Sequence, residues 1–283
     1  MAKGTADSPV WFITGCSSGF GREFVRAALA HGFRVVATAR DPKKLGDIVA
    51  GKADKAKVLA LDVTKPDQIK HAVGEAERAF GRIDVLVNNA GYGYLAAVEE
   101  GEEKDIHAIF ETNFFGVVAM IRAVLPGMRA RRHGYIVNIA SVGGVVGHAG
   151  SGYYAATKFA VEGLSESLAQ EVEPLGIRVL IVEPGPFRTN FGRSVKQSPN
   201  VIADYEKSAG KHRRETIERS GKQPGDPARA AEAVINALQP PTPPRHLVLG
   251  RGGFDNVENQ LRSLLQEADL WKATSLGADY PAA

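Results

Sequence analysis

The sequence is poor in several features that would point to particular classes of protein. It has a single cysteine, Cys16, among 283 residues, which excludes an internal disulfide framework and a cysteine-rich metal site; no metal site is expected. The net charge is only +3, with 35 basic and 32 acidic residues interspersed, which argues against a nucleic-acid-binding protein. No apolar run approaches the roughly 20 residues that span a bilayer, and the first nine residues lack a signal-peptide core. We therefore expect a cytoplasmic, reduced protein.

What the chain does have is an alternation of short apolar runs with longer amphipathic stretches. The apolar runs predict strands that are covered on both faces: Val10 to Ile13, Arg34 to Ala39, Lys57 to Leu61, Ile83 to Val87, Tyr135 to Ile139, Arg178 to Val182 and His246 to Leu249. Helical periodicity is found at 21–30, 66–80, 103–131, 152–173, 227–238 and 257–268. Repeated strand–helix units predict an α/β fold with a doubly wound parallel sheet of about seven strands, in one domain spanning 1–283.

Residues 190–225 interrupt this alternation. They are polar and charged, as in Lys211-His212-Arg213-Arg214, and contain few long apolar runs. Two interpretations are open: a solvated helical excursion, or a mobile lid over a substrate pocket. Residues 251–283 are expected to form a C-terminal tail helix.

A glycine-rich segment, Thr14-Gly15-Cys16-Ser17-Ser18-Gly19-Phe20-Gly21, follows the first expected strand. Glycines here allow a tight turn, and they let main-chain N–H groups approach a pyrophosphate at the positive end of the next helix. The spacing differs from the Gly-x-Gly-x-x-Gly of most dinucleotide folds. Its place between a buried strand and a helix nevertheless indicates a dinucleotide-binding loop.

The same residues match the nucleophile elbow of serine hydrolases, Gly-x-Ser-x-Gly, with Ser17 as the nucleophile. An elbow serine needs a downstream acid and histidine, and an oxyanion-hole N–H from an earlier strand. The loop follows the first strand, so no earlier strand can donate that N–H. A serine hydrolase is therefore the weaker alternative.

The end of the second strand, Thr38-Ala39-Arg40-Asp41, bears on the choice of cofactor. An acidic residue at this end would bind a ribose 2′-hydroxyl, whereas an arginine suits a 2′-phosphate. Arg40, with Lys43 and Lys44 close behind, favours NADP(H) over NAD(H). Asp41 can instead face the ribose, so NAD(H) stays open.

Tyr154 and Lys158 stand four residues apart on a predicted helix, thirteen residues or more after Ser141. This spacing places a phenol and an ammonium on one helix face. A phenol titrates near pH 10, so lowering its pKa to 7 needs about three units, or roughly 4 kcal/mol. One half-solvated lysine favours the phenolate but rarely supplies that much. A second positive charge or a hydrogen-bond donor is therefore expected.

These segments together resemble the short-chain dehydrogenase/reductase family, in its single-domain subgroup with TGxxxGxG and YxxxK motifs, over roughly residues 9 to 250. Six motifs stand in the family's order: Thr14 to Gly21, Leu61-Asp62-Val63, Asn88-Asn89-Ala90-Gly91, Asn113, the set Ser141, Tyr154 and Lys158, and Pro184 to Thr189. One departure is Phe20, where the family commonly has isoleucine. The resemblance implies a Rossmann-type fold and an oxidoreductase.

The resemblance also implies roles for single residues. The implied catalytic residues are Asn113, Ser141, Tyr154 and Lys158. Tyr154 would exchange a proton with the substrate oxygen that Ser141 holds, Lys158 would bind the nicotinamide ribose, and Asn113 would kink its helix and anchor a proton-relay water. The cationic nicotinamide would be the second positive charge near Tyr154. The implied cofactor contacts are Gly15, Ser17, Ser18, Gly19, Phe20, Gly21, Arg40, Asp62, Val63, Asn89, Ala90, Gly91, Tyr154, Lys158, Pro184, Gly185, Phe187 and Thr189.

The expected reaction interconverts a carbonyl and a secondary alcohol on a hydrophobic small molecule. The expected pocket lining is mostly apolar: Tyr92, Tyr94, Val142 to His148, Phe187 and Phe191. The family implies a homodimer or homotetramer joined through the helices near 103–131 and 152–173. A sensor that binds NADP(H) without turnover is a further alternative, although a pure sensor needs no proton donor.

Overall fold

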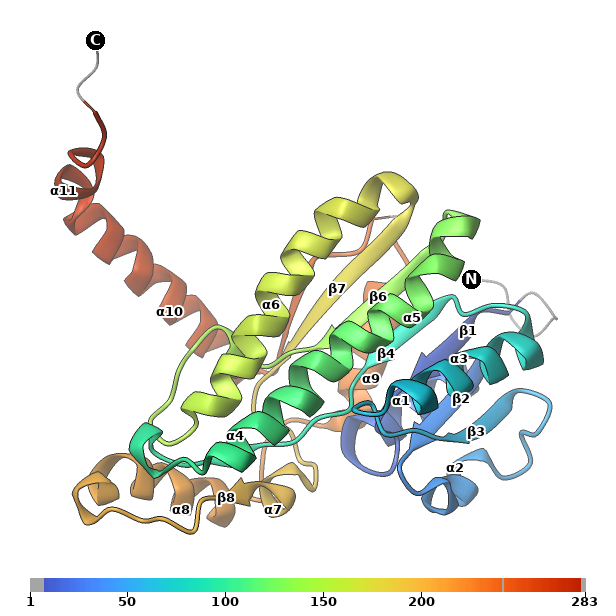
Figure 1. Ribbon diagram of the computed structural model, residues 1–283, viewed down its shortest axis with the longest axis horizontal. Helices are drawn as coiled ribbons and strands as arrows, with labels where there is room; N and C mark the ends of the chain where they lie inside the picture. Colours follow the sequence, from blue (N-terminus) through green and yellow to red (C-terminus); the bar gives the residue numbers. More distant parts are fainter. Residues whose placement is uncertain (1–7, 241, 281–283) are drawn as a thin grey trace.

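The computed structural model describes residues 8–240 and 242–280, and its centre is a sheet of parallel strands (Figure 1). Seven strands follow one another in the order β3-β2-β1-β4-β6-β7-β9. Their bounds are β1 (Val10–Ile13), β2 (Arg34–Ala39), β3 (Ala56–Ala60), β4 (Val85–Asn88), β6 (Gly134–Ile139), β7 (Ile177–Pro184) and β9 (His246–Leu249). This order confirms the predicted doubly wound parallel sheet, and the fold is a Rossmann-type single domain.

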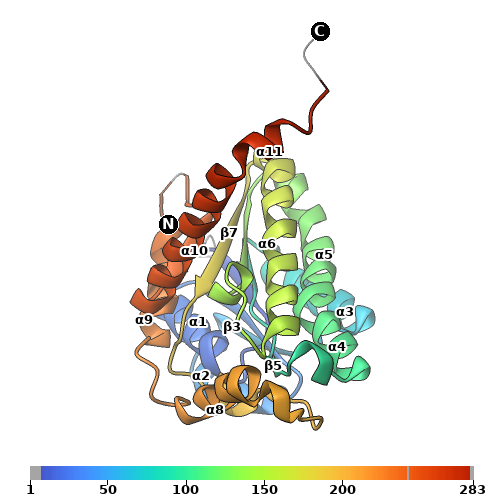
Figure 2. The same ribbon diagram turned by 90° about the vertical axis from the view of Figure 1, so that its left-hand side faces the viewer.

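Helices cover both faces of the sheet, as the two views in Figures 1 and 2 show. Helices α1 (Gly19–Ala30) and α9 (Pro227–Ala237) pack on one face; α3 (Pro66–Phe80), α5 (Gly116–Arg131) and α6 (Gly152–Val172) pack on the other. Successive side chains of β1 enter opposite cores, with Trp11 and Ile13 in one and Val10 and Phe12 in the other. Because a strand alternates its side chains between two covered faces, its sequence is apolar throughout.

The predicted helix at 103–131 is a continuous run with an irregular centre. It consists of α4 (Glu103–Phe110), a π-helical turn (Glu111–Phe115) and α5. By length and composition this 29-residue run is apolar enough to cross a membrane, so the expectation that no apolar stretch reaches that length needs correction. Core helices of soluble proteins can have the same length and composition. In α5, Met120, Ile121 and Met128 are buried in the core between this helix and the sheet.

The segment 190–225 is folded and attached to the chain that follows β4. It contains α7 (Phe191–Ser194), β8 (Lys196–Gln197), a 3-10 turn (Ala203–Tyr205), a π-helical turn (Glu206–Gly210) and α8 (Lys211–Glu218). Strand β8 pairs in parallel with β5 (Tyr94–Leu95). The Arg213 guanidinium lies 2.5 Å from the buried Glu100 carboxylate, and Lys196 Nζ lies 2.5 Å from that of Asp105. These contacts dock the segment onto the edge where the site lies.

The remaining elements are short, except at the C-terminus. They are α2 (Gly46–Val49), 3-10 turns at Pro42–Leu45, Val98–Glu100, Val142–Gly144 and Glu173–Leu175, and α11 (Lys272–Leu276). The last long helix, α10, spans Arg251–Leu270, so it begins with the tail helix expected at 251–283 and six residues before the periodic stretch that starts at Val257. Gly252 and Gly253 lie inside it, and Gly253 packs against Gly185. The expectations for the signal peptide and for the end of the tail fall partly on residues 1–7 and 281–283, outside the described residues.

Candidate functional site

The predicted site residues lie where the strands end. The glycine loop follows β1, Arg40 follows β2, Asp62 follows β3, Asn89 follows β4, and Ser141 follows β6. Because all these strands are parallel, their carboxyl ends lie along one edge of the sheet, and ligands of open α/β sheets bind in the crevice outside that edge. The structure therefore brings together motifs that are up to 175 residues apart, from Thr14 to Thr189.

Close backbone approaches explain the glycines of the loop between β1 and α1. Gly15 has a φ of +70°, and a Cβ there would lie 2.8 Å from Ala90 Cα. A Cβ on Gly21 would collide with the carbonyl oxygen of Gly15 and lie 2.7 Å from Asn89 Nδ2. The first turn of α1 contains no acidic residue. The helix N-terminus is thus uncrowded and positive, and this cradle fits a pyrophosphate.

Asn89 and Thr14 hold this loop in place. Asn89 Nδ2 donates to the carbonyl oxygens of Thr14, at 2.8 Å, and Gly15, at 3.1 Å. Thr14 Oγ1 accepts from the backbone N–H groups of Asn89 and Ala90, both at 3.0 Å. Both amide hydrogens of Asn89 are used in this way. Its side chain therefore positions the loop, while Ala90 and the exposed Gly91 continue along the edge of the site.

At the adenine end of the expected site, some charged side chains are exposed and others accept hydrogen bonds from the protein. Arg40 is exposed, whereas the Asp41 carboxylate accepts the backbone N–H of Lys43 at 3.1 Å. Asp62 accepts from the backbone N–H of Thr64 at 3.0 Å and from its hydroxyl at 2.8 Å. Burial opposes ionisation of Asp62, but these hydrogen bonds and the Arg40 charge leave its pKa below its usual value. Val63 is 7% exposed and packs under Gly116, so it offers a ligand its backbone only.

Tyr154 and Lys158 lie together on α6, as the spacing predicted. Lys158 Nζ lies 5.8 Å from the centroid of the Tyr154 ring and donates to the carbonyl oxygen of Ile139 at 2.7 Å. Lys158 is only 8% exposed, and the expectation of a half-solvated lysine was therefore wrong. Burial lowers the pKa of Lys158 to about 8, although Glu162 opposes the change.

The hydroxyl of Tyr154 interacts with Ser141. Burial raises the pKa of Tyr154, and the hydrogen bond with the Ser141 side chain opposes the rise. Ser141 Oγ also accepts the backbone N–H of Gly143 at 3.0 Å, which fixes the serine at the start of the Val142–Gly144 turn. We expected Lys158 to lower the pKa of Tyr154. In the protein without cofactor this expectation is wrong, because burial has the larger effect and raises that pKa.

Asn113 lies at the centre of the π-helical turn and has no exposed surface. Its Oδ1 accepts the backbone N–H of Tyr92 at 3.0 Å, and its Nδ2 donates to the Tyr92 carbonyl at 2.9 Å and to Thr157 Oγ1 at 3.2 Å. The expected irregularity in this helix is therefore present. Gly91 lies beside both Asn113 and Lys158, since a Cβ there would be 3.0 Å from Asn113 Oδ1 and 3.9 Å from Lys158 Nζ.

The segment after β7 closes toward the glycine loop. Gly185 packs against Gly253, next to Pro184 at the end of β7, and a Cβ on Gly19 would lie 3.5 Å from Thr189. The Phe187 ring centroid is 5.2 Å from that of Phe20. This contact explains why a large ring is tolerated at position 20: it packs on Phe187 and away from the loop backbone.

Aromatic side chains lie beside Tyr154, with one exception to the expected lining. The Phe191 ring centroid is 5.6 Å from that of Tyr154, and Phe191 is 39% exposed. Tyr92 is partly buried and packs, as Tyr154 does, against the cluster of Tyr94, Ala96 and Ile109. Tyr94, by contrast, is 1% exposed, and its hydroxyl accepts the backbone N–H of Glu102 at 2.9 Å. It supports the wall of the site and does not line it.

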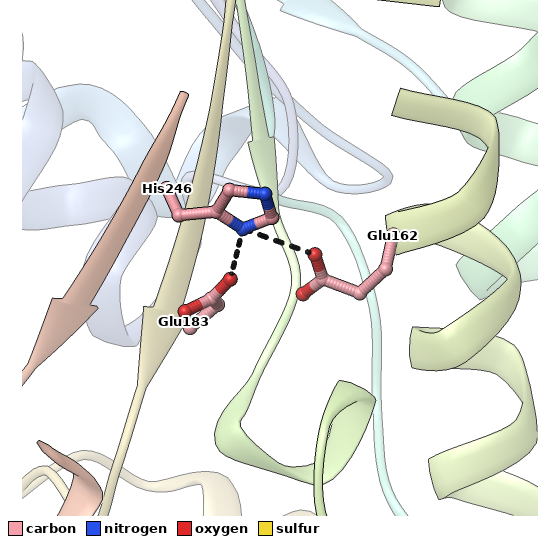
Figure 3. A group of neighbouring side chains, drawn as sticks. All are labelled: Glu162, Glu183 and His246. Atoms are coloured by element: carbon pink, nitrogen blue, oxygen red, sulfur yellow. Dashed lines mark hydrogen bonds and ion pairs between the residues drawn. The ribbon is translucent and has the colours of Figure 1, made fainter. Parts of the chain in front are cut away.

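A cluster of charged residues that the sequence did not single out includes Glu162, Glu183 and His246 (Figure 3). His246 Nδ1 is 2.6 Å from Glu183 Oε1 and 3.8 Å from Glu162 Oε2. On its other side His246 pairs with Glu166, which also binds Arg245 at 3.1 Å. Neither oxygen of Glu162 has a hydrogen-bond partner among the described residues. In the sequence, this cluster could have been suspected only from Glu162, which stands four residues after Lys158 on the same helix face.

The ligand atoms of Glu162, Glu183 and His246 lie within 4.8 Å of one another, close enough to hold a metal ion. The three carboxylates of the cluster are already matched by three basic side chains, His246, Arg245 and Lys158. Burial and Glu183 raise the pKa of Glu162 to about 8, while His246 and Lys158 oppose the rise. Burial lowers the pKa of His246, but its hydrogen bonds to Glu183 and Glu166 leave it raised. Acidic and basic side chains of the cluster therefore face one another at short distances.

Ser17 lacks the histidine and acid that a serine hydrolase would need beside its nucleophile. Ser17 is exposed, and no histidine or carboxylate in the described part of the chain is hydrogen-bonded to it. Its loop follows β1, the first strand in the chain. The geometry at this loop suits an anion at a helix N-terminus and not an acyl group.

Comparison with known proteins agrees with this geometry. A family model described as short chain dehydrogenase matches residues 9–200. The oxidoreductase BOA17 of Botryotinia fuckeliana is 38% identical over 95% of this chain and 98% of its own length. A 3-ketodihydrosphingosine reductase of Bacteroides thetaiotaomicron is 40% identical over 81% of this chain and 84% of its own. The crystal structure of a short-chain dehydrogenase from Streptomyces avermitilis superposes with a TM-score of 0.90 at 43% identity, covering 96% of this chain and 100% of that chain. Among other matching structures, some hold NADP and some NAD.

Proposed function

The chain is an oxidoreductase that belongs to the short-chain dehydrogenase family, and we propose that it uses NADP(H) to interconvert a carbonyl and a secondary alcohol on a hydrophobic small molecule. One observation carries the proposal. The hydroxyl of Tyr154 is hydrogen-bonded to Ser141 and lies beside the buried Lys158, at the sheet edge that also carries the glycine cradle. A proton donor, an oxygen-binding hydroxyl and a cation next to a dinucleotide loop are the groups this reaction needs.

The residues around the cradle fit a dinucleotide. The backbone of Gly15 to Gly21 and the N-terminus of α1 would hold the pyrophosphate, Asp62 and the backbone of Val63 and Ala90 the adenosine, and Lys158 the nicotinamide ribose. Pro184, Gly185, Phe187 and Thr189 would border the nicotinamide. When bound, the nicotinamide supplies or accepts the hydride.

The protein's own part is the movement of a proton. In reduction, Tyr154 gives its proton to the substrate oxygen while Ser141 donates a hydrogen bond to the same atom. Because burial raises the pKa of Tyr154, the phenol is protonated at neutral pH and can act as this acid. The charge of Lys158 then stabilises the phenolate that remains. Asn113, beside Gly91 and close to Lys158, would anchor the water that returns the proton.

The preference for NADP(H) is supported by how the two charged residues after β2 are engaged. Arg40 is exposed and directed at no carboxylate within ion-pair distance among the described residues. The Asp41 carboxylate caps the next turn by accepting the backbone N–H of Lys43, so one of its oxygens is already engaged within the protein. An arginine that can form two hydrogen bonds with a 2′-phosphate is the physical basis of this preference.

An apolar substrate is supported by the side chains next to Tyr154. Phe191 lies beside the phenol, Tyr92 packs on the same buried cluster as Tyr154, and Val145 and Val146 are partly exposed in the turn after Ser141. The relative described as a 3-ketodihydrosphingosine reductase is named for a ketone with a long aliphatic chain. A ketone on a long apolar chain is thus the first substrate class to examine. Homo-oligomerisation through the helices at 103–131 and 152–173 and a cytoplasmic location stay predictions.

A panel of aliphatic, aromatic and long-chain ketones, followed by NADPH absorbance at 340 nm, tests the proposal. A serine-reactive phosphonate is applied to the same protein. We expect NADPH oxidation with at least one long-chain ketone and no phosphonate label on Ser17. NADPH binding without oxidation of any kind would indicate the sensor, and labelling of Ser17 with ester hydrolysis would indicate the hydrolase; either result would contradict the reductase.

A further inference from the structure

The C-terminal helix α10 leaves the body of the protein and exposes most of its apolar side chains. Figure 1 shows α10 and α11 extending away from the sheet and its covering helices. Gly253 and Val257 are its buried residues. Every residue from 261 to 280 is exposed, including Leu261 at 55%, Leu264 at 50% and Trp271 at 58%. The exposed part of α10, residues 261–270, is shorter than the roughly 12–15 residues below which an isolated helix is marginally stable in water, and such apolar stripes mark interaction surfaces.

Apart from Leu265 and Leu270, the larger apolar residues of α10 form a repeat together with Ala268 and with Trp271, which directly follows the helix. They stand at positions separated alternately by three and four residues: Phe254, Val257, Leu261, Leu264, Ala268 and Trp271. This is the spacing of the a and d positions of a coiled coil, in which each side chain enters a hole on a facing helix. The pattern therefore indicates a helix as the occupant of this stripe.

A groove lies at the start of the stripe. Val248 of β9 and Phe254, Val257 and Leu261 of α10 form its apolar lining, with Glu258 and Arg262 at its border, and it encloses about 290 Å³. An exposed indole, that of Trp271, stands at the opposite end of the same stripe. A tryptophan buries a large apolar ring and keeps its N–H accessible, so it suits a groove with a polar border. The molecule thus carries both a groove and a ring that would fill it.

We propose that α10 pairs in antiparallel orientation with α10 of a second copy of this chain, about a two-fold axis between Arg262 and Ser263. In this register Leu261 faces Leu264 of the second copy, Val257 faces its Ala268, and Phe254 faces its Trp271. Each indole then enters the groove of the other copy, and the symmetry makes both ends of the pair identical. The seam from Phe254 to Trp271 is about 25 Å long at 1.5 Å per residue.

Charge on the polar side of the helix argues for a protein occupant over a membrane surface. The ionisable residues of the pairing region are three basic and four acidic: Arg251, Asp255, Glu258, Arg262, Glu267, Asp269 and Lys272. Helices that lie on membranes typically carry an excess of lysine and arginine on the polar side, which anionic lipids attract. A slightly acidic polar side lacks this attraction. The surface is also separate from the helices at 103–131 and 152–173, so the inference is independent of the proposed activity.

Cysteine cross-linking tests the register directly, because the one native cysteine, Cys16, is buried. Phe254→Cys and Trp271→Cys proteins are prepared separately, mixed at high micromolar concentration and oxidised. We expect a disulfide-linked dimer from the mixture and none from either variant alone, since each position lies about 25 Å from its own symmetry mate. The mixed dimer keeps one native contact between Phe254 and Trp271 at its other end. Dimers from each single variant would indicate a parallel pair and overturn the proposal, as would no cross-link in the mixture.

A second measurement compares the same substitution on and off the stripe. Leu264→Glu places a charge in the seam, whereas Leu270→Glu places it at a more exposed position of the same helix, 79% exposed and outside the repeat. Sedimentation equilibrium should show self-association weakened at least tenfold by Leu264→Glu and unchanged by Leu270→Glu, with equal helicity by circular dichroism. Equal association of the two variants would overturn the proposal. So would binding of the wild-type protein to phosphatidylcholine–phosphatidylglycerol vesicles that Leu264→Glu abolishes without a change in association.

Discussion

At the scale of single residues, burial and neighbouring groups shift the pKa values of the site's titratable side chains away from their usual values. Tyr154 keeps its proton because burial raises its pKa, which suits an acid in the reductive direction. Lys158 is buried with its Nζ bonded to the Ile139 carbonyl, and burial brings its pKa down to about 8. The positive charge that the tyrosinate needs is therefore held by a group that loses its proton only slightly above neutral pH.

Glu162→Gln should change the pH dependence of turnover through Lys158. Near pH 7 Glu162 holds a proton, since its pKa is raised to about 8, so the neutral amide should leave kcat/KM within about twofold. Above pH 8 ionised Glu162 raises the pKa of Lys158 and keeps it charged. Without that carboxylate the alkaline fall of kcat/KM should begin at lower pH.

The control for this profile is Glu171→Gln, an exposed position on the same helix. Profiles of kcat/KM against pH that coincide for wild type and both variants would show that Glu162 does not act on Lys158. A loss of activity at pH 7 in Glu162→Gln, with an unmoved alkaline limb, would indicate a structural role.

Arg40→Asp should move cofactor preference toward NADH. The substitution removes the guanidinium offered to the 2′-phosphate and puts a repelling carboxylate in its place, and one hydrogen bond to a charged group contributes about 1.5–3 kcal/mol. The ratio of kcat/KM for NADPH to that for NADH should fall at least tenfold. Arg78→Asp, on the exposed side of α3, is the matched control. An unchanged ratio would remove Arg40 from cofactor selection.

At the scale of elements, the π-helical turn between α4 and α5 joins three parts of the site. Asn113 binds the backbone of Tyr92 through both its oxygen and its nitrogen, and it reaches Thr157 on α6. Such one-turn irregularities inside long helices occur frequently at functional sites. Here the turn points a buried amide at the segment after β4, one residue beyond Gly91.

Asn113→Ala should lower the free energy of unfolding by about 1–3 kcal/mol, because it leaves the N–H and the carbonyl of the partly buried Tyr92 without their partners. Urea denaturation of the protein without ligands measures this loss. Thr112→Ala, one residue earlier and only partly buried, should change it by less than about 0.5 kcal/mol. Equal effects of the two substitutions would contradict a specific role of the Asn113 hydrogen bonds.

At the scale of the whole molecule, the parts that could be predicted from sequence are those set by neighbouring residues. The bounds of β1, β2, β9 and α3 follow from short-range apolar patterns and from Pro66 at the start of α3. The pairing of Tyr154 with Lys158 follows from helical spacing. What could not be predicted depends on long-range packing: the burial of Tyr94 and Lys158, and the approach of His246 to Glu183, 63 residues away.

The start of α10 shows both sides of this limit. The tail helix was expected from residue 251, although the helical periodicity begins only at Val257, whereas the packing of Gly253 against Gly185 inside that helix could not be predicted from any local pattern. Likewise, Asn89 was predicted as a cofactor contact from its motif, while its two hydrogen bonds to the loop depend on how β1 and β4 lie side by side.

The segment 190–225 should become protected from proteases when cofactor and substrate bind. It is docked at Glu100 and Asp105, and Phe191 lies against Tyr154, so occupancy of the site would add contacts to its inner side. Limited proteolysis with and without NADPH and a substrate ketone, followed by mass spectrometry, measures the cleavage rates. Cleavage within 272–280, in the exposed tail, serves as the internal control. Equal rates within 190–225 in both states would exclude a lid.

The most direct test of the central claim, that the Tyr154 hydroxyl is the proton donor, is a single-turnover measurement on Tyr154→Phe. The substitution removes one oxygen and leaves the ring that packs on Phe191. The account predicts that the rate of NADPH oxidation by bound ketone falls at least about a hundredfold, while the Kd for NADPH, measured by fluorescence, stays within a fewfold. A variant that oxidises NADPH at the wild-type rate would contradict it.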